Sequence, residues 1–439
     1  MRRSIATLAA TVLTLAVPAA ARAEWSAPVA LSGGISEPSC CGDLGFASDG
    51  RGAALWSEHS QESHTNGRYA GFQMPTRTAG GSWFAHSHRP HGAAAVEPLR
   101  FSLAADGGLV LFGLRLSRPG YVNQRTTGLA ARFGHLTASG ITIKHTQRLL
   151  RSRTFDSPTF AANGTGDAVA AWAVRNASSG PRLRVQEGVY ARLRGAGGRF
   201  GKIRRLARRP SAFSFLTAAV GARGDVAVVW RRGGKIFARI APPGGDFGKR
   251  LLVGAGKGRP SAAVGPHGEV VVAWTRKVVD EDRLRAAVRE PGHDFVETRI
   301  NWSAHRAPLV TAFDRSGRAL IGWQSSVQGH PVEQEVIAHV TMLGAGPPQT
   351  VTMPSDGPVV DIAASRDNRV AAVVVGPTGV RVALRSASGS WAPLELASTA
   401  RADGASVAFD PLTGQPNVVH QVPQPGEPTE SAFAVARIG

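Results

Sequence analysis

Apolar and polar positions follow one another along this chain in a repeated pattern: a short apolar run, a tight polar turn and a second apolar run. The clearest copy is PSAAVGPHGEVVVAWTRK, residues 260–277, whose second run ends at Trp274. Turns of this kind, rich in Gly, Asp and Asn, favour β-hairpins because these residues accept a positive φ at little steric cost. The second run is apolar on both sides, which is typical of a strand covered on both faces. The pattern therefore predicts a hairpin whose second strand is buried.

Recognisable versions of this unit recur along the whole chain. The turn and second run lie at 48–56, 105–112, 162–172, 222–230, 266–274, 315–323, 365–374 and 411–420. One position near the end of the second run is tryptophan in five copies, namely Trp56, Trp172, Trp230, Trp274 and Trp323. We expect Phe112, Val374 and His420 to take that position in the other copies. Repeats about 50 residues apart indicate a tandem array of one supersecondary unit.

Each hairpin is followed by a third run centred on Ala and, in most copies, by a fourth that opens with Gly and an aromatic residue. Four antiparallel strands in about 50 residues, repeated in tandem, predict the blades of a β-propeller. No 3.6-residue apolar period runs through the units, which argues against a helical solenoid. Evenly spaced units also leave no room for a linker, so we expect residues 24–439 to form a single domain.

The two ends of the chain complete each other in this scheme. Residues 432–439, AFAVARIG, read as a third strand with no fourth strand after it, and residues 24–32, EWSAPVALS, match the fourth-strand segment GSWAPLELA at 389–397. We expect the N-terminal strand to close the last blade, which removes an exposed sheet edge. The count is then eight blades, with seven as the alternative if a degenerate copy packs differently. The predicted blade starts lie near residues 43, 99, 157, 215, 260, 308, 358 and 405.

The first 23 residues have the features of a secretory signal peptide. Arg2 and Arg3 precede an apolar run over 5–17, and a small-x-small cleavage site lies at 21–23. The run is too short for a stable membrane anchor, and no later apolar segment is long enough to span a bilayer. We therefore expect a protein that is secreted or otherwise extracytoplasmic, without a membrane span.

The formal net charge of +20 favours anionic neighbours such as polysaccharides. An Ala- and Arg-rich composition alone also produces such a charge, and no basic run of five or more residues occurs. No specific nucleic-acid binding is therefore predicted. The densest basic stretch, residues 202–209, reads as the outer edge of a sheet, where charge discourages edge-to-edge pairing.

Candidate ligand-binding residues fall in the segments that connect fourth to first and second to third strands, the loops that form the usual ligand face of a propeller. The adjacent Cys40 and Cys41 lie just before the first inner strand. Joined to each other they would form a strained, rigid platform, whereas two thiols would only rigidify the loop. The same face is expected to carry Glu58, His59, His64 and Arg68.

Three further histidines, His86, His88 and His91, lie near the fourth strand of the first unit. Side chains two apart on a strand point to the same side, so His86 and His88 could bind Zn²⁺ or Cu²⁺ with a neighbouring histidine. The spacing matches no recognised zinc motif, and exposed loop histidines are the alternative interpretation. A divalent metal is therefore a weak prediction, and no other cofactor is expected.

The units resemble those of secreted bacterial β-propellers over nearly the whole chain. Ser48, Asp49, Gly52 and Trp56 are similar to the Ser-x-Asp-x-Gly-x-Thr-Trp box of sialidase-like propellers, but the Thr is absent and the turn joins first and second strands rather than third and fourth. Cys40-Cys41 and the Ala47-x-Asp49…Trp56 pattern are similar to features of quinoprotein alcohol dehydrogenases, whose Thr-Gly docking pair is missing here. Both resemblances concern the fold, and fold does not imply function.

No complete catalytic motif occurs in the sequence. The first hypothesis is a secreted, monomeric, non-catalytic binding or scaffold propeller that recognises an anionic glycan, a cell-envelope polymer or an extracellular protein. The alternative is a sialidase-like glycoside hydrolase, and a cofactor-dependent oxidoreductase ranks third. Whether the protein is an enzyme stays open, with binding preferred.

Overall fold

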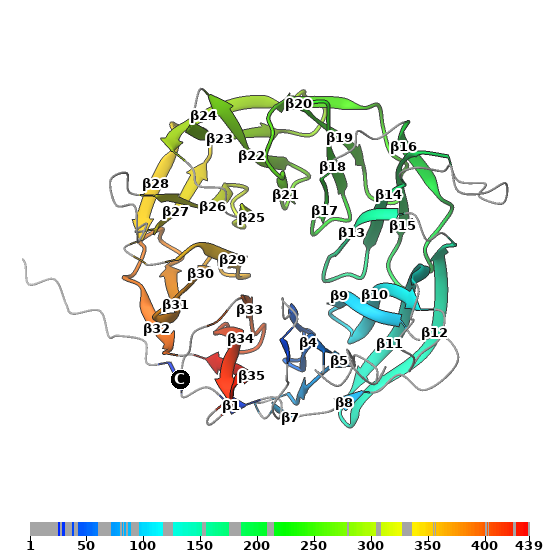
Figure 1. The fold of residues 1–439 in the computed structure, drawn as a ribbon, viewed down its shortest axis with the longest axis vertical. Coiled ribbons are helices and arrows are strands. Elements are labelled where there is room, and N and C mark those ends of the chain that lie inside the picture. Colours follow the sequence, from blue (N-terminus) through cyan, green and yellow to red (C-terminus); the bar gives the residue numbers. More distant parts are fainter. Residues whose placement is uncertain are drawn as a thin grey trace, which may run out of the picture.

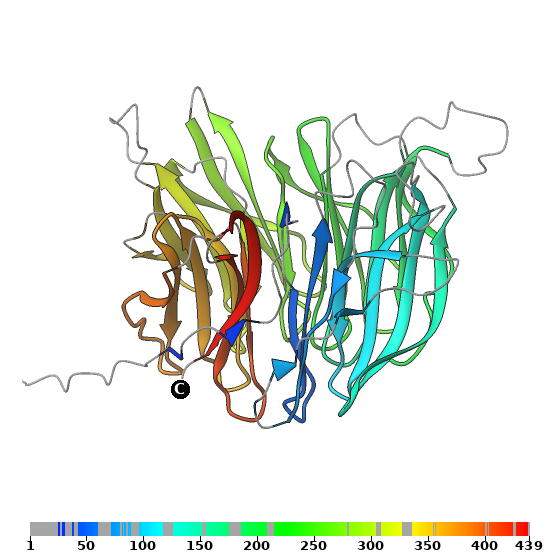
Figure 2. The same ribbon diagram turned by 60° about the horizontal axis from the view of Figure 1, so that its bottom comes forward.

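The computed structural model describes residues 25–26, 29–30, 37–38, 43–59, 72–79, 81, 83–84, 87–88, 96–116, 126–151, 155–174, 186–208, 215–278, 281–303, 309–326, 336–353, 355, 357–399, 402, 404–424 and 427–437. Eight sheets stand in a ring around a central channel, so the predicted all-β, eight-bladed propeller is confirmed (Figure 1). The strands run roughly along the channel axis, which gathers the connections at two opposite faces (Figure 2). The described residues contain no helix, and hence none that could cross a membrane.

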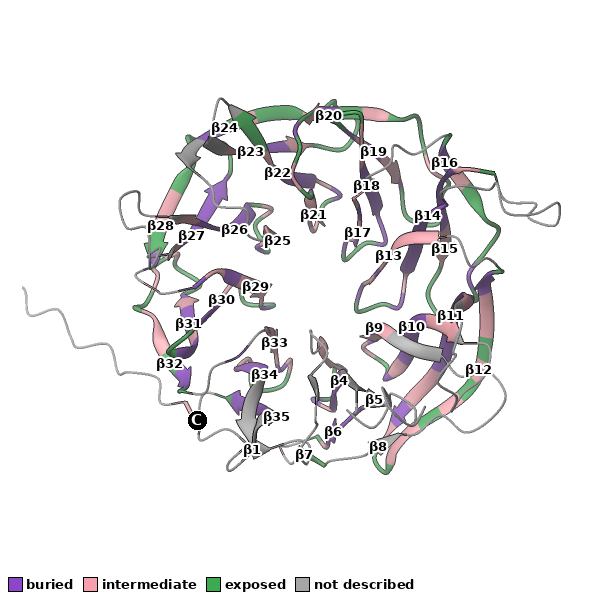
Figure 3. Ribbon diagram, in the orientation of Figure 1, coloured by how far each residue is buried: buried purple, intermediate pink, exposed green. Residues whose placement is uncertain are grey.

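Blades 2 to 7 each contain four antiparallel strands in chain order, with the first strand innermost. Blade 2 comprises β9 (Val96–Leu103), β10 (Gly108–Leu116), β11 (Thr126–Thr137) and β12 (Gly140–Leu150). Blade 3 comprises β13 (Phe155–Ala162), β14 (Ala168–Val174), β15 (Gly188–Arg194) and β16 (Arg204–Arg208). Blade 4 comprises β17 (Leu216–Val220), β18 (Val226–Arg232), β19 (Lys235–Ala241) and β20 (Leu251–Ala255). Blade 5 comprises β21 (Ser261–Val264), β22 (Val270–Val278), β23 (Glu281–Arg289) and β24 (Val296–Ser303). Blade 6 comprises β25 (Val310–Phe313), β26 (Ala319–Ser326), β27 (Val336–Leu343) and β28 (Gln349–Met353). Blade 7 comprises β29 (Val359–Ala364), β30 (Val370–Gly376), β31 (Gly379–Arg385) and β32 (Glu395–Ser398). Buried residues concentrate in the two middle strands (Figure 3).

Blade 8 joins the two ends of the chain. It consists of β33 (Ala405–Phe409), β34 (Pro416–Gln424), β35 (Glu427–Arg437) and, as its outer strand, the N-terminal β1 (Val29–Ala30). Val29 pairs with Val435 and Ala30 with Ala434, and the Ser26 N–H donates to the Arg437 carbonyl at 2.7 Å. The predicted closure of the last blade by the N-terminal strand is therefore confirmed.

Blade 1 has the least regular sheet. Its inner strands are β3 (Asp43–Phe46) and β4 (Gly52–His59), followed by the short strands β5 (Phe72–Gln73), β6 (Thr76–Arg77), β7 (Trp83–Phe84) and β8 (Ser87–His88). The extra strand β2 (Glu37–Pro38) pairs with the end of β4. Across the molecule the innermost strands begin at residues 43, 96, 155, 216, 261, 310, 359 and 405, close to the predicted blade starts.

Every hairpin between a first and a second strand has the same tight turn. Its fourth residue has a positive φ in blades 1 to 7, from 66° at Asn368 to 93° at Gly268, and the turn of blade 8 is one residue longer with Gly414 at 66°. Blade 7 has Asn368 there, at 66°, which fits because Asn tolerates the left-handed region better than most residues. These turns lie on one face of the ring, called the turn face below. It is opposite to the face formed by the fourth-to-first and second-to-third connections, where the sequence analysis expected the ligand.

The tryptophans of the repeat fill the spaces between blades. Trp172, Trp230, Trp274 and Trp323 are fully buried, and each packs against the second strand of the preceding blade. Only the backbone of Trp56 is described. Val374 and His420 lie at the equivalent positions of blades 7 and 8 and are also buried.

The expectation that Phe112 takes the tryptophan position of blade 2 is wrong. In blade 1 the partner of Asp43 is Leu55, one residue before Trp56, whereas in blade 2 the equivalent residue Arg100 pairs with Phe112. Gly113 therefore occupies the tryptophan position. Because successive side chains of a strand point to opposite faces, Phe112 points to blade 3, where its ring stacks on Phe160 at 5.5 Å.

Two fully buried ion pairs connect neighbouring blades at equivalent places. Arg385 of blade 7 lies 3.2 Å from Asp314 in the blade 6 turn, and Arg77 of blade 1 lies 2.7 Å from Asp410 in the blade 8 turn. Burial alone would raise the pKa of Asp410, but the Leu412 N–H and the Arg77 guanidinium bind the carboxylate and lower its pKa. A charged pair at each place therefore joins one blade to the next.

A buried histidine in blade 6 predicts pH-dependent stability. His339 stacks on Trp323 at 4.2 Å, contacts the hydroxyls of Ser325 and Thr352, and is 3% exposed. Desolvation lowers its pKa from 6.5 to about 4, so the folded protein keeps the ring neutral while the unfolded chain protonates it below pH 6.5. Stability from this group is therefore complete above pH 6.5 and is lost as pH falls towards 4.

We expect urea denaturation to show wild-type protein losing about 2–3 kcal/mol more than the His339→Gln variant between pH 7 and pH 4. Comparison with this non-titrating variant removes the contribution of the carboxyl groups. Parallel pH curves for the two proteins would contradict the assignment.

Candidate functional site

The innermost strands enclose a central channel. It has a volume of about 600 Å³. Part of its wall is formed by the small residues Gly and Ala, contributed by β3, β13, β17, β21 and β25. Each innermost strand lies at the edge of its sheet, so its unpaired backbone N–H and C=O groups also face the channel.

Four polar side chains from four consecutive blades gather on one side of this wall, and we call them the channel cluster: Asp361 (blade 7), Ser406 (blade 8), Asp43 (blade 1) and Arg100 (blade 2). Asp43 lies 2.5 Å from Arg100 Nη1 and accepts the Phe101 N–H at 3.1 Å. Asp361 accepts the Ser406 hydroxyl and the Val407 N–H, both at 2.9 Å. Each carboxylate thus reaches across to the innermost strand of the next blade.

The channel cluster is electrostatically unusual. Desolvation raises the pKa of Asp43 in spite of the Arg100 guanidinium, and desolvation also raises the pKa of Asp361, with a further contribution from the negative charge of Asp43. Arg100 keeps 47% of its side chain exposed in the channel. Carboxyl groups with raised pKa values and an accessible guanidinium can hydrogen-bond a polar ligand, and raised carboxyl pKa values also occur in acid catalysts.

The channel has a mouth of about 540 Å³ on the turn face, lined mainly by the turns of blades 7 and 8, with Ser48, Ala105 and Gly164 from the turns of blades 1, 2 and 3. Two neighbouring turns beside this mouth carry four arginines, Arg315 and Arg318 in blade 6 and Arg366 and Arg369 in blade 7. We call them the basic arc. The Arg315 backbone N–H donates to Asn368 Oδ1 at 2.9 Å and its side chain donates to the Arg366 carbonyl, which holds the two turns together.

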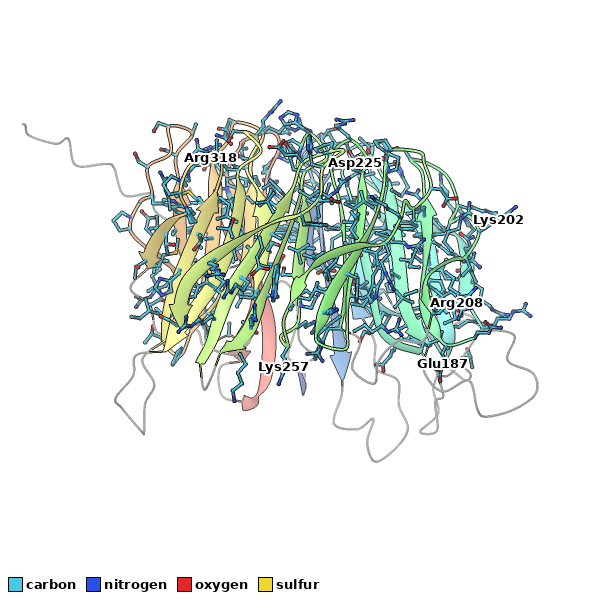
Figure 4. The ribbon with its side chains drawn as sticks, turned by 90° about the horizontal axis from the view of Figure 1, so that it is seen from above. Glu187, Lys202, Arg208, Asp225, Lys257 and Arg318 are labelled. Carbon is cyan, nitrogen blue, oxygen red and sulfur yellow. The ribbon has the colours of Figure 1, made fainter. Side chains whose placement is uncertain are left out.

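The basic arc keeps an excess of positive charge because its nearby carboxylates already have partners. Asp314 is buried against Arg385 and also lies 4.0 Å from Arg318 Nε, and Asp367 lies 2.7 Å from Arg369 Nε. Arg315, Arg318 and Arg366 are exposed. Turns elsewhere on this face carry acids, among them Asp106, Asp167, Asp225 and Glu269 in blades 2 to 5, and the exposed Arg223 of blade 4 lies 3.8 Å from Asp225. Figure 4 shows Arg318 and Asp225 on the turn face and Lys257 and Glu187 on the opposite face.

The residues singled out from sequence fall mostly outside the described part of the chain. Cys40, Cys41, His64, Arg68, His86 and His91 are not described. The backbones of Glu58, His59 and His88 are described within β4 and β8, where Glu58 pairs with Pro38 and His59 with Glu37. The structure therefore leaves their role as ligand or metal residues a prediction. Among the described residues no three His, Cys, Asp or Glu side chains are grouped to hold a metal.

Sequence reasoning missed both the channel cluster and the basic arc. Asp43, Arg100, Asp361 and Ser406 share one position, four residues before the first turn residue of their units. An alignment of the repeats on the turn would have shown that this position carries charge in three copies. The four arginines of the basic arc lie in two successive turns about 50 residues apart, a spacing that a search for basic runs does not detect.

No family model matches the chain, and no curated protein matches its sequence. Similar solved structures include a prolyl endopeptidase (13% identity, 88% of this chain and 55% of that chain, TM-score 0.49), the polysaccharide lyase Uly1 (9%, 94% and 100%, 0.45) and the microbial sialidase Hz136 (9%, 73% and 77%, 0.37). The chain thus spans about half of the prolyl endopeptidase. At such identities the likeness concerns the fold alone and transfers no activity.

Proposed function

We propose that this protein is an extracytoplasmic, non-catalytic propeller that binds an anionic glycan of the cell envelope or its surroundings on the turn face. The observation that carries the proposal is the basic arc, in which three exposed arginines stand beside a cavity while the adjacent carboxylates are already paired. The signal-like residues 1–23 support the location. A multivalent polymer suits this geometry because several modest charge contacts add along one chain.

The test compares two variants of equal charge. Arg315→Gln/Arg318→Gln/Arg366→Gln removes three charges from the basic arc, and Lys202→Gln/Arg208→Gln/Lys257→Gln removes three exposed charges elsewhere (Figure 4). Exposed charge contacts contribute about 0.5–1 kcal/mol each, so we expect the first variant to bind polygalacturonate roughly ten- to a hundredfold more weakly. The control should change the affinity less than about threefold.

Binding is measured by biolayer interferometry at several salt concentrations, with neutral dextran beside polygalacturonate. We expect no binding to dextran and a weaker affinity for polygalacturonate at higher salt, because salt screens exposed charges. Equal losses in the two variants would mean that only net charge matters, and the basic arc would then not be the site.

Glycoside hydrolysis is the second candidate, and the channel cluster is the observation that favours it. Asp43 and Asp361 both have raised pKa values in a desolvated channel, as a general acid requires. Turnover of any fluorogenic glycoside by wild-type protein, abolished in Asp361→Asn, would replace the binding proposal with this one.

A further inference from the structure

A separate cavity lies between blades 2 and 3 on the turn face. Its volume is about 190 Å³, and Phe133, Lys144, His145, Arg194 and Asp106 contribute to its lining. This is below the roughly 300 Å³ at which pockets for drug-sized ligands begin, so the cavity suits one small group rather than a polymer chain. It shares no residue of the channel cluster or the basic arc.

Arg194 is held in place by the protein before any ligand arrives. Its guanidinium lies 5.3 Å from the centre of the Phe133 ring, Nε donates to the Gly198 carbonyl at 2.8 Å, and Nη1 donates to the Gly166 carbonyl. A guanidinium has five N–H groups in a planar fork. Most of them therefore have no protein acceptor among the described residues, and the fork is pre-organised for an oxyanion.

His145 stacks on the same phenylalanine, at 4.5 Å from Phe133, and its buried Nε2 has no hydrogen-bond partner among the described residues. Buried polar atoms normally have a partner, so this nitrogen is a candidate to hydrogen-bond a ligand. Lys144 adds a positive charge on the neighbouring residue. Desolvation and the charges of Arg199 and Arg194 lower the pKa of His145, which agrees with a positive potential here.

The carboxylates near this cavity already accept backbone hydrogen bonds. Asp106 Oδ1 accepts the Gly108 N–H at 2.8 Å, and Asp167 Oδ1 accepts the Ala196 N–H at 3.1 Å. Neither lies in an ion pair with Lys144 among the described contacts. Neither forms an ion pair with Arg194 among these contacts either, although the charges of Asp167 and Asp106 oppose the desolvation that lowers the pKa of Arg194. The guanidinium fork and the ammonium group can therefore still bind an external anion, while Asp106 can also accept a ligand hydroxyl.

We propose that this cavity binds one oxyanion-bearing group of monosaccharide size, such as an acidic sugar. Arg194 would bind two oxygens of the anion, Lys144 would contribute charge, and His145 Nε2 would complete its hydrogen bonding. The site goes beyond the proposed function because it does not depend on the basic arc.

The experiment titrates D-glucuronate and, as a neutral match, D-glucose by ligand-observed NMR, with sulfate as a competitor. Arg194→Met keeps an apolar contact on Phe133 but removes the fork, and Lys144→Gln changes an exposed side chain. Arg289→Met is the matched control, because Arg289 has the same register in blade 5 as Arg194 in blade 3. We expect glucuronate to bind at least about tenfold more weakly to both cavity variants and unchanged to the control.

Displacement of glucuronate by sulfate would show that the oxyanion alone is recognised, and absence of displacement would show that the sugar carboxylate is required; both support the site. Equal binding of glucose, or unchanged glucuronate affinity in both cavity variants, would overturn it. The Arg315→Gln/Arg318→Gln/Arg366→Gln protein should bind glucuronate like wild type. A loss there would place the acidic sugar at the basic arc and also overturn the cavity.

Discussion

Replacing Arg385 with methionine is expected to lower the free energy of unfolding by about 3–5 kcal/mol, because the substitution removes the only buried counter-ion described for the Asp314 carboxylate and leaves the exposed Arg318, 4.0 Å away. Both side chains are almost completely buried, at 1% and 0% exposure, and Nη1 lies 3.2 Å from Oδ2. Asp314 Oδ1 meanwhile accepts the backbone N–H groups of Ser316 and Arg318, so the carboxylate cannot move to solvent without opening its turn. Urea denaturation of wild type and variant measures the difference.

The double variant Arg385→Met/Asp314→Asn separates charge from packing. Asparagine keeps an oxygen for the turn and removes the uncompensated charge, so we expect it to recover at least half of the loss. Arg289→Met is the control, because Arg289 has the equivalent register in blade 5 but faces a preceding turn that begins with Gly221 rather than an acid. It should change stability by less than about 1 kcal/mol. A double variant as unstable as the single one would assign the effect to lost packing instead.

Replacing Trp230 with alanine is expected to destabilise the protein by about 3–5 kcal/mol, since it opens a cavity between two blades that cannot collapse freely in a closed ring. Trp230 is fully buried and packs with Val169 and Ala171 of the preceding blade. Its indole N–H has no hydrogen-bond partner among the described residues, so the loss is one of packing. Trp230→Phe should lose less than half as much stability as Trp230→Ala.

The control for this prediction comes from the same blade. Leu252 on the outer strand is 57% exposed, and Leu252→Ala should change the free energy of unfolding by no more than about 0.5 kcal/mol. Thermal denaturation should give the highest melting temperatures for wild type and Leu252→Ala, a lower one for Trp230→Phe and the lowest for Trp230→Ala. Similar losses for Trp230→Ala and Leu252→Ala would mean that the contact between blades does not limit stability.

The candidate site was far less predictable than the fold. Asp43 and Arg100 are 57 residues apart in sequence, and Asp361 is more than 300 residues from Asp43, yet all three line one channel. No local pattern relates them, because each lies on the innermost strand of a different blade and the ring alone brings them together. The same holds for Lys144 and Arg194 in the cavity between blades 2 and 3.

The amino-acid sequence by itself determined the repeated hairpin, the number of blades and the pairing of residues 29–30 with the C-terminal strand, because turn chemistry, apolar runs and an unpaired end strand are local properties. Only the tertiary structure decided that Gly113 rather than Phe112 lies at the tryptophan position, since a shift of one residue moves a side chain to the other face of its sheet. It also decided where charge collects. The ring brings equivalent positions of the blades to one channel and one face. A charged residue at such a position stays unpaired or not according to the partners that its own and the neighbouring blades supply.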